Sequence, residues 1–215
     1  MRIIAGTYRR RLLESVPGLE VRPTPDRLRE ALFNILAPRI QGAVFVDAYA
    51  GTGAVGIEAL SRGARRAIFI ERDRVALHVI RQNLLSLHIG TEAVVLRGSA
   101  ARLVKEQRAD IVFADPPYER KNEYGAMLEA VTAENCRLLI LQHESRFDPG
   151  EGHGALRRTR VVKHGSNALS FYEPAWAADA EADADGGAGR INERPGASEE
   201  ESEEREEEEH EQGGD

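Results

Sequence analysis

Five short apolar runs, separated by segments with helical spacing, are the feature that most constrains how this chain can fold. The runs lie at residues 43–50, 66–71, 93–98, 110–115 and 137–143. Helices are expected between them, ending near Ser61, Leu87 and Glu106, with another around 123–133; Asp73 is placed to cap the second. Strands that alternate with helices in this way predict a mostly parallel sheet covered by helices on both faces, which is the α/β class.

Further elements are expected at both ends of this α/β region. Two runs, 156–165 and 168–174, surround a Gly-Ser-Asn turn and predict an antiparallel hairpin, giving a seven-stranded sheet. Arginine-rich runs on either side of Gly6 predict a short N-terminal β-hairpin, and RPTPDRLREALFNIL predicts a helix that ends at Pro38. The chain therefore divides into an N-terminal hairpin (1–22), an α/β domain (23–176) and a tail (177–215).

The charge of the chain is distributed unevenly. After Ala178 there are 16 acidic residues and three arginines, so this segment carries −13 and residues 1–178 carry +6. The acidic segment has almost no large apolar residues and is expected to be disordered. The basic remainder favours a polyanionic partner such as RNA or DNA.

Cysteine usage and hydropathy indicate the cellular compartment. Cys136 is the only cysteine, which excludes an intrachain disulfide and fits a reducing cytosol. No apolar run has the length of a membrane span, and the first residues do not resemble a signal peptide. We expect a soluble, cytoplasmic protein, and we assign it no metal site.

A Gly-x-Gly-x-x-Gly sequence (Gly51, Gly53, Gly56) follows the first strand and begins a helix. Such glycines let backbone amides approach a ligand, and Glu71 lies where a carboxylate can hold ribose hydroxyls. This spacing also fits a nicotinamide-dependent dehydrogenase. Asp47, at the end of the first strand, favours S-adenosylmethionine instead, because a carboxylate there suits the methionine ammonium and would repel a pyrophosphate.

The sequence Asp115-Pro116-Pro117-Tyr118 follows the fourth strand, so it faces the same crevice. The prolines fix the backbone, so that the Asp115 carboxylate and the Pro116 carbonyl can both accept from one exocyclic amine, while Tyr118 stacks on the base. Two acceptors favour a tetrahedral nitrogen whose lone pair attacks a sulfonium methyl, and Asp115 can take up the released proton. This corner predicts methylation of a base amine.

Several motifs, with the spacing between them, resemble the RsmD family of bacterial methyltransferases, which methylate N2 of one guanine in 16S ribosomal RNA. They are MRIIAGTYRRRLL, RPTPDRLREALFNIL, VDAYAGTGAVGIEALSRGA, IERD and DPPY, and the likeness covers residues 1 to about 174. The resemblance implies a Rossmann-like class I fold that uses S-adenosylmethionine and releases S-adenosylhomocysteine. It further implies a monomer that acts on the 30S subunit with its ribosomal proteins, assembled or partly assembled.

The resemblance also implies roles for individual residues of this chain. On the cofactor, the methionine part would contact Asp47, Gly51 and Gly53, the ribose Glu71, and the adenine Ser99. The target guanine would lie against Asp115, Pro116, Pro117 and Tyr118. The RNA would be contacted by arginines of the hairpin and of the following helix: Arg9, Arg10, Arg11, Arg22, Arg27 and Arg29.

Two departures from the family pattern affect the site, and other functions stay open. Ser99 replaces an expected acid near the adenine, which weakens that contact, and Tyr49 replaces a Phe. One alternative is a related Asp-Pro-Pro-Tyr methyltransferase that acts on adenine N6 in DNA or on another amine. A second is a non-catalytic RNA-binding assembly factor, and the dehydrogenase is the last.

Overall fold

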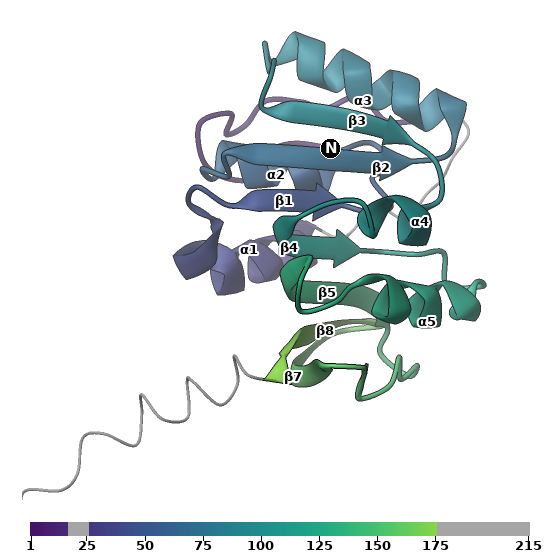
Figure 1. Cartoon of the computed structure of the whole chain (residues 1–215). Coiled ribbons are helices and arrows are strands. Elements are labelled where there is room, and N and C mark those ends of the chain that lie inside the picture. The colour runs from purple at the N-terminus through teal and green to yellow at the C-terminus, as the bar shows by residue number, and fades with distance from the viewer. Residues whose placement is uncertain (17–25, 176–215) are drawn as a thin grey trace, which may run out of the picture.

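A mixed β-sheet forms the centre of the computed structural model, which describes residues 1–16 and 26–175 (Figure 1). Its strands are β1 (Val44–Asp47), β2 (Arg66–Glu71), β3 (Ala93–Arg97), β4 (Ala109–Ala114), β5 (Cys136–Glu144), β6 (Gly152–His153), β7 (Leu156–His164) and β8 (Asn167–Pro174). Their order in space is β3-β2-β1-β4-β5-β8-β7-β6. Strands β1 to β5 are parallel, and β8, β7 and β6 each run antiparallel to the preceding neighbour in that order.

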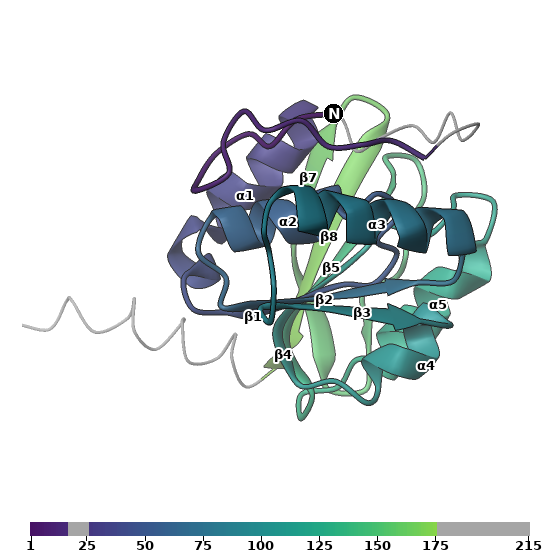
Figure 2. The same ribbon diagram turned by 90° about the horizontal axis from the view of Figure 1, so that it is seen from above.

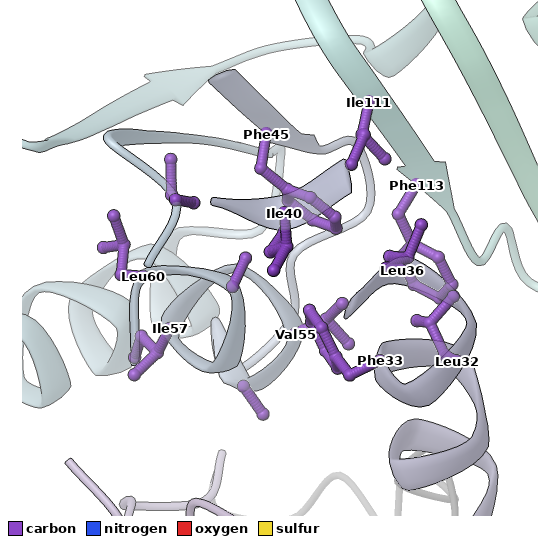
Figure 3. Close-up of a cluster of buried hydrophobic side chains, with 14 of the residues drawn as sticks. Leu32, Phe33, Leu36, Ile40, Phe45, Val55, Ile57, Leu60, Ile111 and Phe113 are labelled. Atoms are coloured by element: carbon purple, nitrogen blue, oxygen red, sulfur yellow. The ribbon is translucent and has the colours of Figure 1, made fainter. Parts of the chain in front are cut away.

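Helices cover both faces of the sheet (Figure 2). One face carries α1 (Asp26–Ile40), α2 (Ala54–Ser61) and α3 (Arg74–Ser86), and the other carries α4 (Ala100–Val104) and α5 (Lys121–Ala130). Each layer closes over its own apolar core. In the first core, Leu36 of α1 and Val55 of α2 pack with Phe45 and Phe113 of the sheet (Figure 3). In the part of the chain that is described, no helix has the length and apolar character needed to cross a membrane.

The predicted α/β architecture is confirmed, with differences in detail. The seven predicted strands form, and the sheet gains β6, which has two residues and is too short to show a sequence pattern. Helix α1 continues past Pro38 to Ile40. Because Pro38 lies in the last turn, its missing N–H costs the helix one bond, and Ile40 is buried in the core. The tail and residues 17–25 lie outside the described residues.

Residues 1–16, here called the N-terminal strap, turn back on themselves as predicted but form one isolated bridge, between Arg2 and Leu12. Much of the strap instead docks on polar side chains of the helices. The buried carboxylate of Glu58 in α2 accepts hydrogen bonds from the backbone N–H groups of Ile4 (2.8 Å) and Ala5 (3.0 Å). A short α2 therefore holds the strap against the first helical layer.

Close packing of α2 on the sheet requires a glycine at position 56. A Cβ there would lie 2.3 Å from the buried ring of Phe69. We expect Gly56→Ala to lower the free energy of unfolding by about 1–3 kcal/mol, because relieving the overlap shifts a core ring or the helix. Gly125→Ala is the matched control. Gly125 lies in α5, where a Cβ meets no atom within 4 Å, and the substitution should raise the free energy of unfolding by up to about 1 kcal/mol. Urea unfolding measures both, and equal effects would contradict this packing.

Candidate active site

At one edge of the sheet, three strands each carry a buried aromatic residue that is followed two positions later by an acidic residue. Side chains two residues apart on a strand share a face, so each acid lies above a ring buried under the first helical layer. The pairs of ring and acid are Phe45 and Asp47 on β1, Phe69 and Glu71 on β2, and Phe113 and Asp115 at the end of β4. The period-2 pattern thus turns from apolar to acidic where the parallel strands end.

The register of the sheet places these acids at two depths. Asp47 pairs with Phe69 on β2 and with Phe113 on β4. Glu71 and Asp115 follow those partners by two residues, so they project about 6.6 Å further along the strands. Asp47 therefore lies deepest, at a position that we call the floor, with Glu71 and Asp115 higher on either side.

A cavity of about 560 Å³ opens above this floor. It lies at the ends of β1 and β4, the switch point where the strand order reverses and where open α/β sheets bind ligands. Six of the nine predicted catalytic and cofactor-binding residues line it: Asp47, Gly51, Glu71, Ser99, Asp115 and Pro117. The predicted residues Gly53, Pro116 and Tyr118 are not among its lining residues.

The environment of Asp47 suits a cationic ligand. The side chain is buried, and its Oδ2 accepts from the backbone N–H of Gly56 at 2.9 Å. Burial raises the pKa of Asp47 from 3.8 to about 7, an effect that the Gly56 hydrogen bond opposes and the charge of Glu71 increases. A cation bound against Asp47 would favour the ionised carboxylate.

The carboxylate of Glu71 is oriented by the backbone. Its Oε2 accepts from the N–H of Gly51 at 2.9 Å, and its Oε1 accepts from the N–H groups of Arg72 and Asp73 at 2.8 and 2.9 Å. Gly51 has a φ of 54°, in the left-handed region that favours glycine. These contacts link the glycine loop after β1 to the end of β2.

The other predicted cofactor residues occupy helix starts. Ser99 precedes α4, and its side chain makes no capping bond to that helix. Gly53 precedes α2 in a left-handed conformation and donates its N–H to the carbonyl of Ala50 at 2.7 Å. A Cβ at Gly53 would contact Phe69 and Ile80, so Gly53 shapes the loop from beneath the cavity.

Polar groups on β5, β8 and α5 support the proline corner. The amide Nε2 of Gln142 donates to Asp115 Oδ2 at 2.8 Å, and the Tyr118 hydroxyl donates to Asn167 Oδ1 at 2.6 Å. The Tyr124 hydroxyl lies 3.5 Å from the Pro116 carbonyl oxygen. Gln142 and Asn167 were not predicted as site residues.

Of the predicted RNA-binding arginines that the structure describes, Arg29 lines the cavity and Arg9, Arg10, Arg11 and Arg27 do not. Arg9, Arg10 and Arg11 are exposed at the turn of the strap, which contacts the carboxyl ends of α2 and α3 through Thr7 to Ser61 (2.8 Å) and Arg11 to Ser86 (3.0 Å). Helix α2 begins at the cavity, so this turn lies at the opposite end of the helix. Arg27 is exposed at the start of α1, and Arg22 lies outside the described residues.

Arg29 corrects the prediction, because its side chain is 1% exposed rather than available to RNA. Its guanidinium donates to the Arg2 carbonyl at 2.6 Å and to Asp26 Oδ1 at 3.0 Å, and lies 4.0 Å from Glu58. Arg29 therefore joins α1, α2 and the strap. The sequence places Arg29 on an amphipathic helix. It does not show that Glu58, on another helix, lies beside the buried guanidinium.

The strand order, with antiparallel β8 between β5 and β7, and the cavity at the β1–β4 switch point define a class I S-adenosylmethionine-dependent methyltransferase. Residues 1–173 match the model of the family described as conserved hypothetical protein 95, the RsmD family. The chain belongs to this family.

Individual relatives agree with this assignment. The chain is 32% identical to the "Putative rRNA methyltransferase YlbH" of Bacillus subtilis over 182 residues, which covers 80% of this chain and 98% of that protein. It is 44% identical to the "Ribosomal RNA small subunit methyltransferase D" of Escherichia coli K12 over 121 residues, 56% of this chain and 61% of that one. Among solved structures, the "Putative methyltransferase yhhF" of Escherichia coli has 35% identity and a TM-score of 0.69, covering 81% and 97% of the two chains.

Proposed function

We propose that this chain methylates the exocyclic N2 of a guanine in 16S ribosomal RNA. The observation that carries the proposal is the position of Asp115. It lines the cavity at the end of β4, and β4 pairs with β1, the strand that ends in the buried Asp47. A carboxylate there can bind an amine that approaches the cofactor. The names of the relatives in Bacillus subtilis and Escherichia coli support ribosomal RNA, and the second of them supports the small subunit. The motif resemblance supports guanine N2.

The residues on the β1 and β2 side of the cavity fit S-adenosylmethionine. We assign Asp47 to the methionine ammonium, because a buried carboxylate with a raised pKa gains most from a cation. Glu71 is assigned to the ribose hydroxyls and Ser99 to the adenine amino group. When bound, the cofactor supplies a methyl group already activated by its sulfonium. The protein residues on this side therefore act by orienting it.

The residues on the β4 side act on the acceptor. Asp115 accepts a hydrogen bond from the N2 amine and takes up its proton as the methyl group is transferred. The Pro116 carbonyl is the second acceptor, and its two lone pairs leave capacity beside the long contact with Tyr124. The bond from Tyr118 to Asn167 restrains the Tyr118 ring for stacking on the base.

We further propose how the parts of the chain divide this work. Residues 1–22 contact RNA, residues 23–176 bind the cofactor and catalyse transfer, and residues 177–215 form an acidic tail without a catalytic role. The substrate is an assembled or partly assembled 30S particle with its ribosomal proteins, because the catalytic body is small and modestly basic. The enzyme acts as a monomer in the cytoplasm, where these particles form.

Mapping the methylated nucleotide tests the proposed function. Purified enzyme and labelled S-adenosylmethionine are incubated with small subunits from cells that lack the enzyme, with protein-free 16S rRNA and with duplex DNA. N2-methylguanine at one position, formed fastest on subunits, is the expected product. N6-methyladenine in DNA would replace the proposal by its nearest alternative. Cofactor binding without methylation of any substrate would indicate an assembly factor.

The strap arginines provide a separate prediction about RNA binding. Substitution of Arg9, Arg10 and Arg11 by Gln is expected to weaken subunit binding and to reduce the slope of log K against log salt by about 2, since each phosphate contact contributes roughly 0.7–0.9. The matched control removes three exposed arginines outside the strap: Arg65, Arg66 and Arg108. Equal losses in both triple variants would show that the strap makes no particular contact.

A further inference from the structure

Gln142 lies on β5, the strand next to β4, at the edge of the cavity. Phe113 pairs with Ile140, and Ala114 pairs with Leu141, so the next step along the parallel strands β4 and β5 brings Asp115 beside Gln142. Phe113 and Ile140 both belong to the core under α1 and α2, so the two polar side chains share that face. Their alignment follows from the backbone register.

The burial of Gln142 makes this contact consequential. The side chain is 3% exposed, and its Nε2 donates to Asp115 Oδ2 at 2.8 Å. A buried amide that loses its partner keeps the full cost of desolvation, so the pair is held together from both sides. Asn167, on the next strand, is also buried and accepts from Tyr118. Strands β5 and β8 thus support the corner from behind.

We propose that Gln142 is a positioning residue for methyl transfer: its amide holds Asp115 Oδ2 so that Oδ1 is presented to the substrate amine. This inference rests on the proposed function of Asp115. A neutral N–H donor on one oxygen restricts rotation of the carboxylate and stabilises its ionised form, the form that accepts the amine proton. A carboxylic acid in place of the amide would share a proton with Asp115 instead.

Two substitutions separate positioning from simple packing. Gln142→Leu removes the donor at similar volume and is expected to lower kcat about tenfold or more, with the Kd for S-adenosylmethionine changed less than about twofold. Gln142→Glu places a second carboxyl beside Asp115, so the acid limb of the kcat–pH profile should move to higher pH, with kcat recovering once both carboxyls are ionised. Gln107→Glu, in the segment that follows the carboxyl end of α4, adds the same charge away from the corner and is the control.

The assay conditions isolate Asp115 from other titrating groups. The charged or titratable groups that face the corner or its cavity are Arg29 on α1, Asp47 on β1, Glu71 on β2 with the following Arg72 and Asp73, Glu123 and Tyr124 on α5, and Tyr118, Glu119 and Glu144. Saturating S-adenosylmethionine keeps Asp47 ionised, and the other groups are unchanged in every variant. The profiles are measured between pH 5.5 and pH 9 on small subunits, with cofactor binding by calorimetry and melting temperature as a check on folding.

The outcomes either support or overturn the inference. An acid limb for Gln142→Glu that coincides with that of Gln107→Glu, together with normal kcat in Gln142→Leu, would overturn it. Carbon-13 NMR of the Asp115 carboxyl adds a readout without substrate: its titration should move to higher pH in Gln142→Leu. Failure of the proposed function looks different, because the unmodified enzyme would then leave ribosomal RNA unmethylated while the NMR difference persists.

Discussion

Asp115→Ala is expected to lower kcat for methylation of small subunits by about a thousandfold while leaving the Kd for S-adenosylmethionine within about threefold. The loss combines two effects: removal of the amine proton by a general base, worth about a hundredfold or more, and orientation of a poorly nucleophilic amine, which supplies the rest. A thousandfold corresponds to about 4 kcal/mol of transition-state stabilisation. Cofactor binding persists because Asp47 and Glu71 lie on other strands.

Single-turnover rates and calorimetry measure these two quantities for Asp115→Ala and for Asp115→Asn, which preserves the shape of the side chain. The Asn variant keeps one acceptor oxygen but cannot take up a proton, so its rate should lie between those of the Ala variant and the unmodified enzyme. Glu129→Gln, an exposed acid on α5, controls for the change in net charge. Normal methylation by Asp115→Ala would place the chemistry elsewhere in the protein.

Much of the site follows from local sequence pattern, for a physical reason. Asp47 and Glu71 end short apolar strands and Asp115 directly follows one, and the carboxyl ends of parallel strands meet at one edge. Period 2 then determines the face of the sheet on which each acid lies. Depth is different: that Asp47 forms the floor depends on which residues pair across β1, β2 and β4, and one chain's spacing does not specify register.

The features that sequence reasoning missed depend on contacts between distant segments. Gln142 and Asn167 look like polar residues near strand ends until β5 and β8 place them behind the corner. Arg29 was predicted to contact RNA, but its side chain is buried, with Glu58 of another helix 4.0 Å away. The strap arginines were predicted to contact RNA without a position relative to the active site, and the bond between Thr7 and Ser61 anchors their turn at the end of α2 opposite the cavity.

Asp47→Asn is expected to weaken S-adenosylmethionine binding by about a hundredfold and to stabilise the ligand-free protein at pH 8. The pKa of Asp47 is about 7 in the folded protein, raised from 3.8 by burial, so the folded state holds a proton that the unfolded chain releases. The contribution of this proton to stability is complete below about pH 4 and is lost as the pH rises through about 7. A neutral Asn, whose Oδ1 can still accept from Gly56, avoids that loss.

Thermal and urea unfolding at pH 5 and pH 8 measure the effect. At pH 8 the Asn variant should be more stable by something on the order of 2–4 kcal/mol without cofactor, with the difference much smaller at pH 5 and reversed by saturating S-adenosylmethionine. In the unmodified enzyme, the Kd for the cofactor should rise by up to about tenfold per pH unit below about pH 7, because the ammonium then competes with a proton. A stability difference independent of pH would show that Asp47 is ionised without its ligand. If instead the prediction holds, the ligand-free fold gives up stability at this position to bind the cofactor, since a charge buried for the ammonium is a cost whenever the cavity holds no cation.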